Sequence, residues 1–494
     1  MPESQASTPT AESEAELAFA GLEAQALMLV SGKVSSRELV ELCLRRIAAS
    51  QPSLNAFRVV CEEAALKEAA AADQRLASGD GAALLGVPIA IKDDVDLAGH
   101  STPFGCGGSH PPAKEDAELV RRLRAAGAIV IGKTQAPEVG QWPFTESAAF
   151  GATRNPWNTG HTPGGSSGGA AAAVAAGLVA GAIGSDGAGS VRIPAAWTGL
   201  VGLKPQRGRI STWPDPEAFN GLTCFGPLTR SVGDAALLLD AVAGDREGDL
   251  HRPPPHSESF AVAASQPLRP LRVALSFATP FGVPDKVDPE VRVATERIAE
   301  RLVELGHEVV PADPRYGLVG LSLVPRGMAG VHEWLCDRVP DHDALEPRTR
   351  VHSRLGRALS GPPLRAARAA EPALARRIGR IFERVDVVLT PTTAAPPPRI
   401  GALEGCGYWA TSTAASAACP FAFAWNVVGW PGLSVPAGFT AAGLPIGAQL
   451  LGQENDEATL LALGGQLEAA ADGEWTKRRP AVTAANAPAA ISAP

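Results

Sequence analysis

Three short segments carry residue types that could perform nucleophilic chemistry. Paired glycines enclose two adjacent serines in GGSSGG (164–169). A second cluster, GSDGAGSVRIPAA (184–196), places Ser190 behind another glycine, and Lys92 ends the apolar run GVPIAIK (86–92). Glycines surround a reactive group when the backbone must approach a substrate closely. A serine hydroxyl attacks a carbonyl only when a base removes its proton, so the base must be identified as well.

GGSSGG by itself leaves several structures open. It matches G-x-S-x-G around both Ser166 and Ser167, which is the nucleophile elbow of α/β-hydrolases and requires a downstream Asp or Glu and then a His. No candidate histidine stands in a distinctive strand-end loop; the candidates are His251, His256, His307, His332, His342 and His352. A phosphate loop before a helix N-terminus is a second interpretation, although the lysine of GxxxxGK[ST] is missing. A glycine turn that caps a core helix is the third.

The three segments together, in this order, resemble the amidase signature enzymes. The pattern of that family is G-G-S-S-G-G, then G-S-D-x-G-G-S-[IV]-R-x-P-A, with an upstream strand G-[VI]-P-x-x-[VI]-K-D. Further matching segments are GATRNPWN (151–158), GLVGLKPQRGRIS (199–211), GPLTRSVGDAALLLD (226–240), NVVGWPGLSVPAG (426–438) and GLPIGAQLLG (443–452). The resemblance covers about residues 16–475. So many ordered motifs argue against a chance match.

The resemblance implies a Ser-Ser-Lys triad. Ser190 is the expected nucleophile, Ser166 the bridging serine after a cis peptide bond from Gly165, and Lys92 the base. A lysine accepts a proton only when it is neutral, and burial favours the neutral form. The apolar segment GVPIAIK supplies such surroundings. A serine hydroxyl both donates and accepts hydrogen bonds, so Ser166 can relay a proton between the other two side chains.

The resemblance also implies an oxyanion hole in the glycine-rich segment before the nucleophile. The backbone N–H groups of Gly187, Ala188 and Gly189, with that of Ser190, are the expected donors. The family commonly has Thr-Gly-Gly at the first three positions, whereas this chain has Gly-Ala-Gly. Only a backbone N–H is needed there, so Ala188 is compatible with activity.

Three further residues are expected to support the triad. Ser167 is the expected hydrogen-bonding neighbour of Ser166. Asp186 and Arg192 are charged residues in an otherwise neutral segment, and we interpret them as fixing the loops that hold Ser166 and Ser190.

The segment AACPFAFAWNVVGWP (417–431) departs from one branch of the family. The branch that amidates tRNA-bound glutamate carries an acidic residue before the Asn, and this segment has none. Recognition of a glutamine amino group is therefore expected to be absent. Five aromatic residues suit an apolar acyl pocket and equally suit a core; they are Trp142, Phe144, Phe421, Phe423 and Trp425.

Composition narrows the class of protein. The 494 residues are 45% hydrophobic and 19% charged, which is typical of a globular protein. A net charge of −8 disfavours nucleic acid or an anionic membrane as a partner. Seven scattered cysteines and an acidic N-terminus without a signal peptide predict free thiols in the cytoplasm. The run Ala170 to Gly184 is too short to span a bilayer, and we predict a core helix there.

Alternating helix and strand patterns predict an α/β fold: a large twisted mixed, mostly parallel β-sheet with helices on both faces. Examples are a strand at 86–92, a helix at 116–127 and a strand at 128–133. We expect one domain over 16–475, with a variable helix-rich insert at about 244–380. Residues 1–15 and 480–494 are predicted to be disordered tails.

The sequence thus predicts an amidase that hydrolyses a linear, non-peptide carboxamide to a carboxylic acid and ammonia or an amine through a Ser190 acyl-enzyme. No metal or organic cofactor is expected, the partner is a small-molecule amide, and a homodimer is left open. One alternative is the A-type chain of a glutamine-dependent amidotransferase. An alternative of another class is a nucleotide- or phosphate-binding protein that uses GGSSGG.

Overall fold

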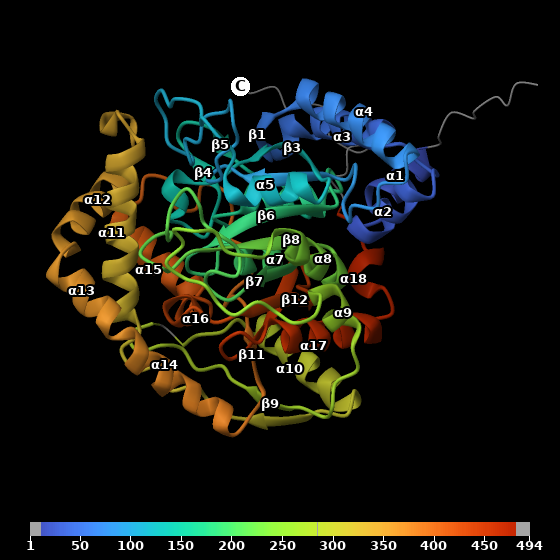
Figure 1. The fold of residues 1–494 in the computed structure, drawn as a ribbon. Coiled ribbons are helices and arrows are strands. Elements are labelled where there is room, and N and C mark those ends of the chain that lie inside the picture. Colours follow the sequence, from blue (N-terminus) through green and yellow to red (C-terminus); the bar gives the residue numbers. More distant parts are fainter. Residues whose placement is uncertain (1–10, 284, 481–494) are drawn as a thin grey trace, which may run out of the picture.

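The computed structural model describes residues 11–283 and 285–480 (Figure 1). Helix α1 (Ala11–Ala18) begins inside the predicted N-terminal tail, so that prediction is wrong from residue 11 onward. Its sequence, AESEAELA, consists mainly of strong helix formers. The next helix, α2 (Leu22–Val30), is separated from α1 because the backbone at Gly21 is non-helical. The C-terminal tail predicted for 480–494 lies outside the described residues except for Pro480.

One eleven-stranded sheet runs through the molecule. In spatial order its strands are β1 (Phe57–Val60), β3 (Ile129–Thr134), β2 (Pro88–Lys92), β6 (Gly181–Asp186), β8 (Cys224–Thr229), β7 (Val201–Lys204), β12 (Gly432–Phe439), β13 (Pro445–Leu451), β11 (Val387–Pro391), β9 (Arg272–Leu275) and β10 (Glu308–Pro311). Strands β4 (Glu146–Ser147) and β5 (Gly151–Ala152) form a separate ribbon.

The pairing confirms the predicted mixed α/β sheet. Parallel pairs form two blocks, β3-β2-β6 and β11-β9-β10. Antiparallel pairs join these blocks through β8, β7, β12 and β13, and β1 adds an antiparallel edge. The block β3-β2-β6 matters for function, because the carboxyl ends of parallel strands meet at one edge of a sheet.

Helices cover both faces of the sheet, as predicted. The face lined by Ile89 and Ile91 packs against α2 (Leu22–Val30), α5 (Glu118–Ala125), α8 (Val232–Val242), α9 (Phe260–Ser265), α10 (Pro289–Glu304) and α17 (Glu457–Ala470). The face lined by Ala90 and Ala182 packs against α3 (Ser36–Leu54), α4 (Glu62–Ala77), α6 (Gly168–Ala175) and α7 (Arg192–Thr198). Successive strand residues point to opposite faces, so one strand serves both cores.

The predicted core helix at Ala170 to Gly184 is wrong in its second half. Helix α6 ends at Ala175, and the chain returns as the buried central strand β6. A run of buried alanine, glycine and valine shows the same apolar pattern in a helix and in a strand between two cores. The strand and helix expected at 128–133 and 116–127 are confirmed by β3 and α5.

The middle of the chain is helix-rich but contributes to the same sheet. Its strands β9 and β10 pair beside β11. Figure 1 shows its long helices along one side of the molecule. They are α11 (Gly320–Arg338), α12 (Pro347–Leu359), α13 (Pro362–Ala369) and α14 (Glu371–Gly379), with η2 (His342–Ala344) and η3 (Arg380–Glu383). The remaining elements are η1 (Glu138–Gly140), α15 (Tyr408–Ala418), α16 (Phe423–Val428) and α18 (Glu474–Lys477).

Two further observations concern the described part of the chain. None of its helices is both long and apolar enough to cross a membrane. All seven cysteines lie within it and are unpaired.

Candidate active site

The end of strand β2 brings Lys92 to the GGSSGG segment. Its Nζ lies 2.7 Å from Oγ of Ser166, a residue 74 positions later in the sequence. The Lys92 side chain is fully buried, and Ser166 precedes the N-terminus of α6. The predicted contact between base and bridging serine is therefore present in the structure. The candidate base in this contact is a lysine, and none of the histidines takes part in it.

Ser166 follows a cis peptide bond from Gly165, as the resemblance implies. Gly165 has no space for a side chain, because a Cβ there would lie 2.5 Å from the backbone nitrogen of Phe144. This close approach fixes the segment against residues 142–144. It explains why a glycine is required directly before the bridging serine.

Two residues of this site were not predicted from the sequence. Oγ of Ser185 lies 2.8 Å from Nζ of Lys92 and donates a short hydrogen bond to Asp94. Oδ2 of Asp94 is itself 3.6 Å from Nζ. Ser185 lies in the motif GSDG directly before Asp186, and Asp94 ends the motif IKDD two positions after Lys92. Their places in these motifs are the signal that could have identified them.

The charge of Lys92 depends on two opposing effects. Desolvation by burial lowers the pKa of Lys92, whereas the carboxylates of Asp94, Asp186 and Asp93 oppose that shift. The net direction is a lowered pKa. A lowered pKa increases the neutral fraction that can accept a proton.

Ser190 lies in the turn between β6 and α7 and is partly exposed. Its carbonyl accepts a hydrogen bond from the N–H of Ser167 at 3.2 Å, which connects the two serine segments. Among the described residues its hydroxyl has no hydrogen-bond partner. A partly exposed, unbonded hydroxyl, on a residue whose main chain is bonded to the neighbour of Ser166, is available for a substrate carbonyl.

The expected oxyanion hole requires one correction. The N–H of Gly189 donates to Oδ1 of Asp186 at 2.7 Å, so it is not free to bind an oxyanion. The N–H groups of Gly187, Ala188 and Ser190 have no hydrogen-bond acceptor within the described part of the chain. Gly189 has a different role, since its φ of +116° favours glycine and a Cβ there would lie 2.6 Å from the Cβ of Ala422.

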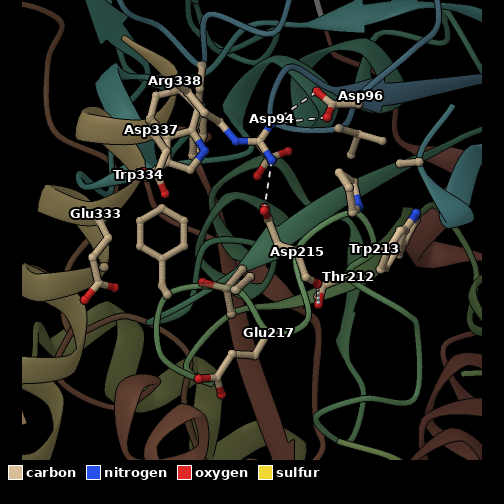
Figure 2. A pocket seen from close by; sticks show the side chains of 18 of the residues that line it. Asp94, Asp96, Thr212, Trp213, Asp215, Glu217, Glu333, Trp334, Asp337 and Arg338 are labelled. Carbon is tan, nitrogen blue, oxygen red and sulfur yellow. Dashed lines mark hydrogen bonds and ion pairs between the residues drawn. The ribbon is translucent and has the colours of Figure 1, made fainter. Parts of the chain in front are cut away.

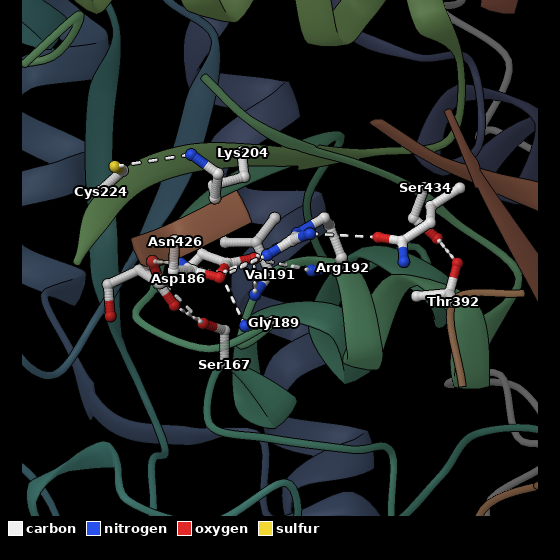
Figure 3. Close-up of polar contacts among 12 residues, drawn as sticks. Ser167, Asp186, Gly189, Val191, Arg192, Lys204, Cys224, Thr392, Asn426 and Ser434 are labelled. Atoms are coloured by element: carbon white, nitrogen blue, oxygen red, sulfur yellow. Dashed lines mark hydrogen bonds and ion pairs between the residues drawn. The ribbon is translucent and has the colours of Figure 1, made fainter. Parts of the chain in front are cut away.

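Asp186 and Arg192 form a fully buried ion pair that organises this turn (Figure 3). The carboxylate also accepts bonds from the N–H groups of Gly189, Val191 and Arg192, at the start of α7. Nδ2 of Asn426 donates to the carboxylate at 2.8 Å, and the Arg192 guanidinium donates to Oδ1 of Asn426 at 2.7 Å. These contacts agree with the structural role expected of the pair.

The Asp186 carboxylate stays ionised despite its burial. Desolvation alone would raise its pKa, but the charge and hydrogen bonds of Arg192 outweigh that effect and hold the pKa of Asp186 well below its usual range. Ser167 supports the site through main-chain contacts, because its Oγ bonds the carbonyl and the N–H of Ser185, each at 3.2 Å. No direct contact links its hydroxyl to Lys92 within the described residues.

Four of the five predicted aromatic residues fall into two groups, and the fifth, Phe421, is buried. The indole N–H of Trp425 donates to the carbonyl of Gly452, and Trp425 lies with Phe423 in a buried core cluster. Trp142 and Phe144 stack with parallel rings 6.1 Å apart, in the segment that packs against Gly165. Only the second group lies beside the bridging serine in a position to line an acyl pocket.

The phosphate-loop interpretation of GGSSGG does not fit this geometry. The segment is buried throughout. The N–H of Gly168 donates to Oγ1 of Thr145 and that of Gly169 to the carbonyl of Gln135. With the N–H of Ser167 bonded to Ser190, the start of α6 offers no free cradle for a phosphate.

Comparisons with known proteins agree with this site. The amidase family model matches residues 38–461. The protein named "Putative amidase AmiA2" of Mycobacterium bovis is 55% identical over 456 residues, which cover 92% of this chain and 93% of the relative. The chain belongs to the amidase family. It is an amidase, a hydrolase that acts on the carbon–nitrogen bond of carboxamides.

Two further known proteins are similar to the chain and differ from each other in the reaction that their names describe. The solved structure of 6-aminohexanoate cyclic dimer hydrolase has a TM-score of 0.86 and 33% sequence identity, covering 94% of this chain and 99% of that one. The A-type chain of the glutamyl-tRNA(Gln) amidotransferase of Synechococcus sp. is 36% identical, over 90% of this chain and 94% of the relative. Both the hydrolase and the amidotransferase chain are therefore similar to the amidase over nearly its whole length.

Proposed function

We propose that the amidase hydrolyses a small-molecule linear carboxamide through an acyl-enzyme on Ser190. The observation that carries the proposal is the 2.7 Å contact between Nζ of the buried Lys92 and Oγ of Ser166, in a segment whose backbone is bonded to Ser190. A neutral lysine behind a relay serine is the arrangement that activates a second serine.

The reaction begins when Oγ of Ser190 attacks the carboxamide carbon. The Ser190 proton passes to Ser166, whose own proton passes to Nζ of Lys92. The carbonyl oxygen of the tetrahedral intermediate is held by the free N–H groups of Gly187, Ala188 and Ser190. One such donor typically contributes about 10²–10³ in rate.

The intermediate collapses when the carbon–nitrogen bond breaks. The leaving nitrogen takes a proton back from Lys92 through Ser166 and departs as ammonia or an amine. Water then attacks the ester carbon of the acyl-enzyme, and its proton follows the same route to Lys92. Breaking of the ester bond releases the carboxylic acid and restores the hydroxyl of Ser190. No step requires a metal or an organic cofactor.

Hydrolysis is favoured over glutamine-dependent amidotransfer for a local reason. Ala422, in the segment without an acidic residue, lies directly beside Gly189. Its neighbours Phe421 and Phe423 are apolar, so this segment offers no carboxylate to the amino group of glutamine.

A panel of amides tests the proposal. The wild-type protein is assayed beside Ser190→Ala, Lys92→Ala and Ser167→Ala on aliphatic, aryl and amino-acid amides. We expect the first two variants to lose at least about 10³-fold in kcat/KM, and Ser167→Ala to retain measurable activity. A fluorophosphonate is expected to label Ser190. Full activity of Ser190→Ala, or labelling of Ser167 in place of Ser190, would overturn the mechanism.

A further inference from the structure

A cavity of about 190 Å³ is lined by side chains that include neighbours of Lys92; Figure 2 shows its lining. Its wall includes Asp94, 3.6 Å from Nζ of Lys92, and Phe104, whose ring centre is 5.2 Å from that nitrogen. Its wall also includes Thr223, and a Cβ at Gly187 would lie 2.6 Å from Oγ1 of that threonine. One layer of side chains therefore separates the cavity from the base and from the oxyanion turn, and a substituent of a bound amide would extend toward it.

The lining of this cavity is strongly acidic. Six of the lining residues carry carboxylates, namely Asp94, Asp96, Asp215, Glu217, Glu333 and Asp337. Arg338 is the one cation among the lining residues, and its guanidinium bonds both Asp96 and Asp215 (Figure 2). Glu217 is paired with Arg368 and His251 outside the cavity. The carboxylates of Asp94, Glu333 and Asp337 remain without an arginine partner in the described structure.

Asp94 provides an independent indication of a ligand. Its side chain is only 8% exposed, and its Oδ1 is buried without a hydrogen-bond partner among the described residues. Its Oδ2 is bonded by Ser185, which leaves Oδ1 as the free acceptor of a cavity-lining carboxylate. A buried carboxylate oxygen without a partner is unfavourable, and a cationic donor would satisfy it.

Aromatic rings complete the lining. Phe104 packs edge-on against Trp334 with ring centres 5.3 Å apart, and against Phe219 at 6.4 Å. Trp213 lines another part of the wall. Aromatic faces attract an ammonium group, and carboxylates add charge-assisted hydrogen bonds. An anionic substituent would meet repulsion here, and a neutral alkyl group would leave Oδ1 of Asp94 unsatisfied.

We propose that this acidic cavity binds a primary ammonium group of the substrate beside Asp94, so that the amidase prefers cationic amides. The inference rests on the proposed mechanism, because the cavity is related to the reaction centre through Asp94 and Phe104 next to Lys92 and through Thr223 next to the oxyanion turn. Glu333 and Asp337 are exposed and lie on one helix, α11, where they attract the cation from solvent.

The ammonium group also complements the chemistry of the base. The Asp94 carboxylate opposes the lowering of the Lys92 pKa. A cation bound to Asp94 offsets the negative field at Nζ, which favours the neutral lysine. Binding of the cationic substituent and activation of the triad therefore act in the same direction.

Two matched pairs of amides test the preference. The acyl pair is 5-aminopentanamide and hexanamide, in which an ammonium replaces a terminal methyl group. The leaving-group pair is N-(2-aminoethyl)acetamide and N-propylacetamide. At neutral pH we expect kcat/KM to be about tenfold higher for the ammonium member of one pair, as is typical of a charged hydrogen bond. The pair that shows the preference identifies the side of the scissile bond that enters the cavity. A ratio of one or less in both pairs overturns the inference.

Variants at the exposed carboxylates test whether the acidic cavity causes the preference for cationic amides. The double variant Glu333→Gln/Asp337→Asn is expected to lower the ammonium-to-methyl ratio roughly threefold. Glu300→Gln, an exposed carboxylate on α10 away from the cavity lining, is the control and should leave the ratio unchanged. An equal ratio in the double variant and in the wild type contradicts the proposal.

A binding probe separates this inference from the catalytic one. Benzylammonium is expected to inhibit hydrolysis of hexanamide competitively and at least about tenfold more tightly than benzyl alcohol. Inhibition equal to that by benzyl alcohol contradicts a cation site. If Ser190→Ala abolishes hexanamide hydrolysis while both ratios stay at one, the acyl-enzyme mechanism stands and the cation site fails. Undiminished hydrolysis by Ser190→Ala contradicts the acyl-enzyme mechanism.

Discussion

At the scale of single residues, the site depends on two buried charged groups that burial affects differently. Burial lowers the pKa of Lys92, because desolvation outweighs the opposing effect of Asp94, whose carboxylate lies 3.6 Å from Nζ, and of the other nearby carboxylates. Asp186 has the Arg192 guanidinium at 3.0 Å, so it stays ionised. These opposite shifts suit the roles proposed for the two groups, Lys92 as a base and Asp186 as a fixed anchor of the turn that carries Ser190.

The pH dependence of kcat/KM should report the ionisation of the Lys92 amine. Because the neutral amine is the active form, activity rises as the pH increases through the lowered pKa of Lys92, and the acid limb lies below the ordinary lysine value of 10.5. Lys92→Arg keeps a permanent charge and should be inactive at every pH. Initial rates over a pH series check both statements, and an active Lys92→Arg variant would contradict a lysine base.

Replacing Asp186 should destabilise the fold. In Asp186→Asn the Arg192 charge stays buried without its counter-ion, which typically costs about 3–5 kcal/mol. The folded pKa is depressed, so the contribution is present above the ordinary value of 3.8 and is lost as the pH falls toward the folded value. Urea unfolding at neutral and acidic pH measures this difference. Asp472→Asn, at a fully exposed side chain, is the control and should unfold like the wild type.

At the scale of elements, the parallel block β3-β2-β6 brings the catalytic segments together. The carboxyl end of β2 carries Lys92, that of β6 leads into the oxyanion turn, and α6 begins beside both. The turn between β6 and α7 is held by Asp186 and by close packing around Gly189.

Two neighbouring substitutions in this turn should behave differently. Gly189→Ala places a Cβ 2.6 Å from Ala422 and 2.8 Å from Ile193, at a φ of +116°, and we expect a loss of about 1–3 kcal/mol in stability with at least tenfold lower activity. Ala188 is exposed, so Ala188→Gly should retain activity within a few-fold. Thermal unfolding and kcat/KM of both variants test the turn. Equal stability and equal activity of the two variants would argue against this account of the packing around Gly189.

At the scale of the whole molecule, the helix-rich middle and the catalytic core share one sheet. Strands β9 and β10 extend the sheet beyond β11, while α11 lines the acidic cavity with Glu333, Asp337 and Arg338. We propose that residues 16–475 form a single domain. The middle segment then shapes the substrate site and also completes the core.

A single domain should unfold as one unit. In native-state hydrogen exchange, we expect peptides that contain β2 and β9 to lose their slowest protection at the same denaturant concentration. Independent loss of protection at β9, with β2 still protected, would show that the middle segment is a separate unit. Mass spectrometry of pepsin fragments provides the measurement.

The sequence alone was enough to identify the candidate triad. Lys92, Ser166 and Ser190 were identified from three ordered motifs, and the glycines around them were expected because the backbone approaches reacting groups closely. Individual strands such as β2 and β3 followed from apolar runs bounded by glycine. The end of α6 could not be found in this way, since a buried Ala/Gly run has no period that separates helix from strand.

Tertiary structure decided which atoms are free to act. In the sequence the N–H of Gly189 is equivalent to those of its neighbours, but in the fold the Asp186 carboxylate occupies it. Ser185 and Asp94 became part of the site only when β2 and β6 paired in parallel and brought their carboxyl ends together. The acidic cavity joins Asp94 to Asp337 across 243 positions of the chain. A motif specifies residue types over a short stretch of sequence. Contacts between distant segments depend on how the complete sheet packs, and so does the acceptor that each N–H group finds.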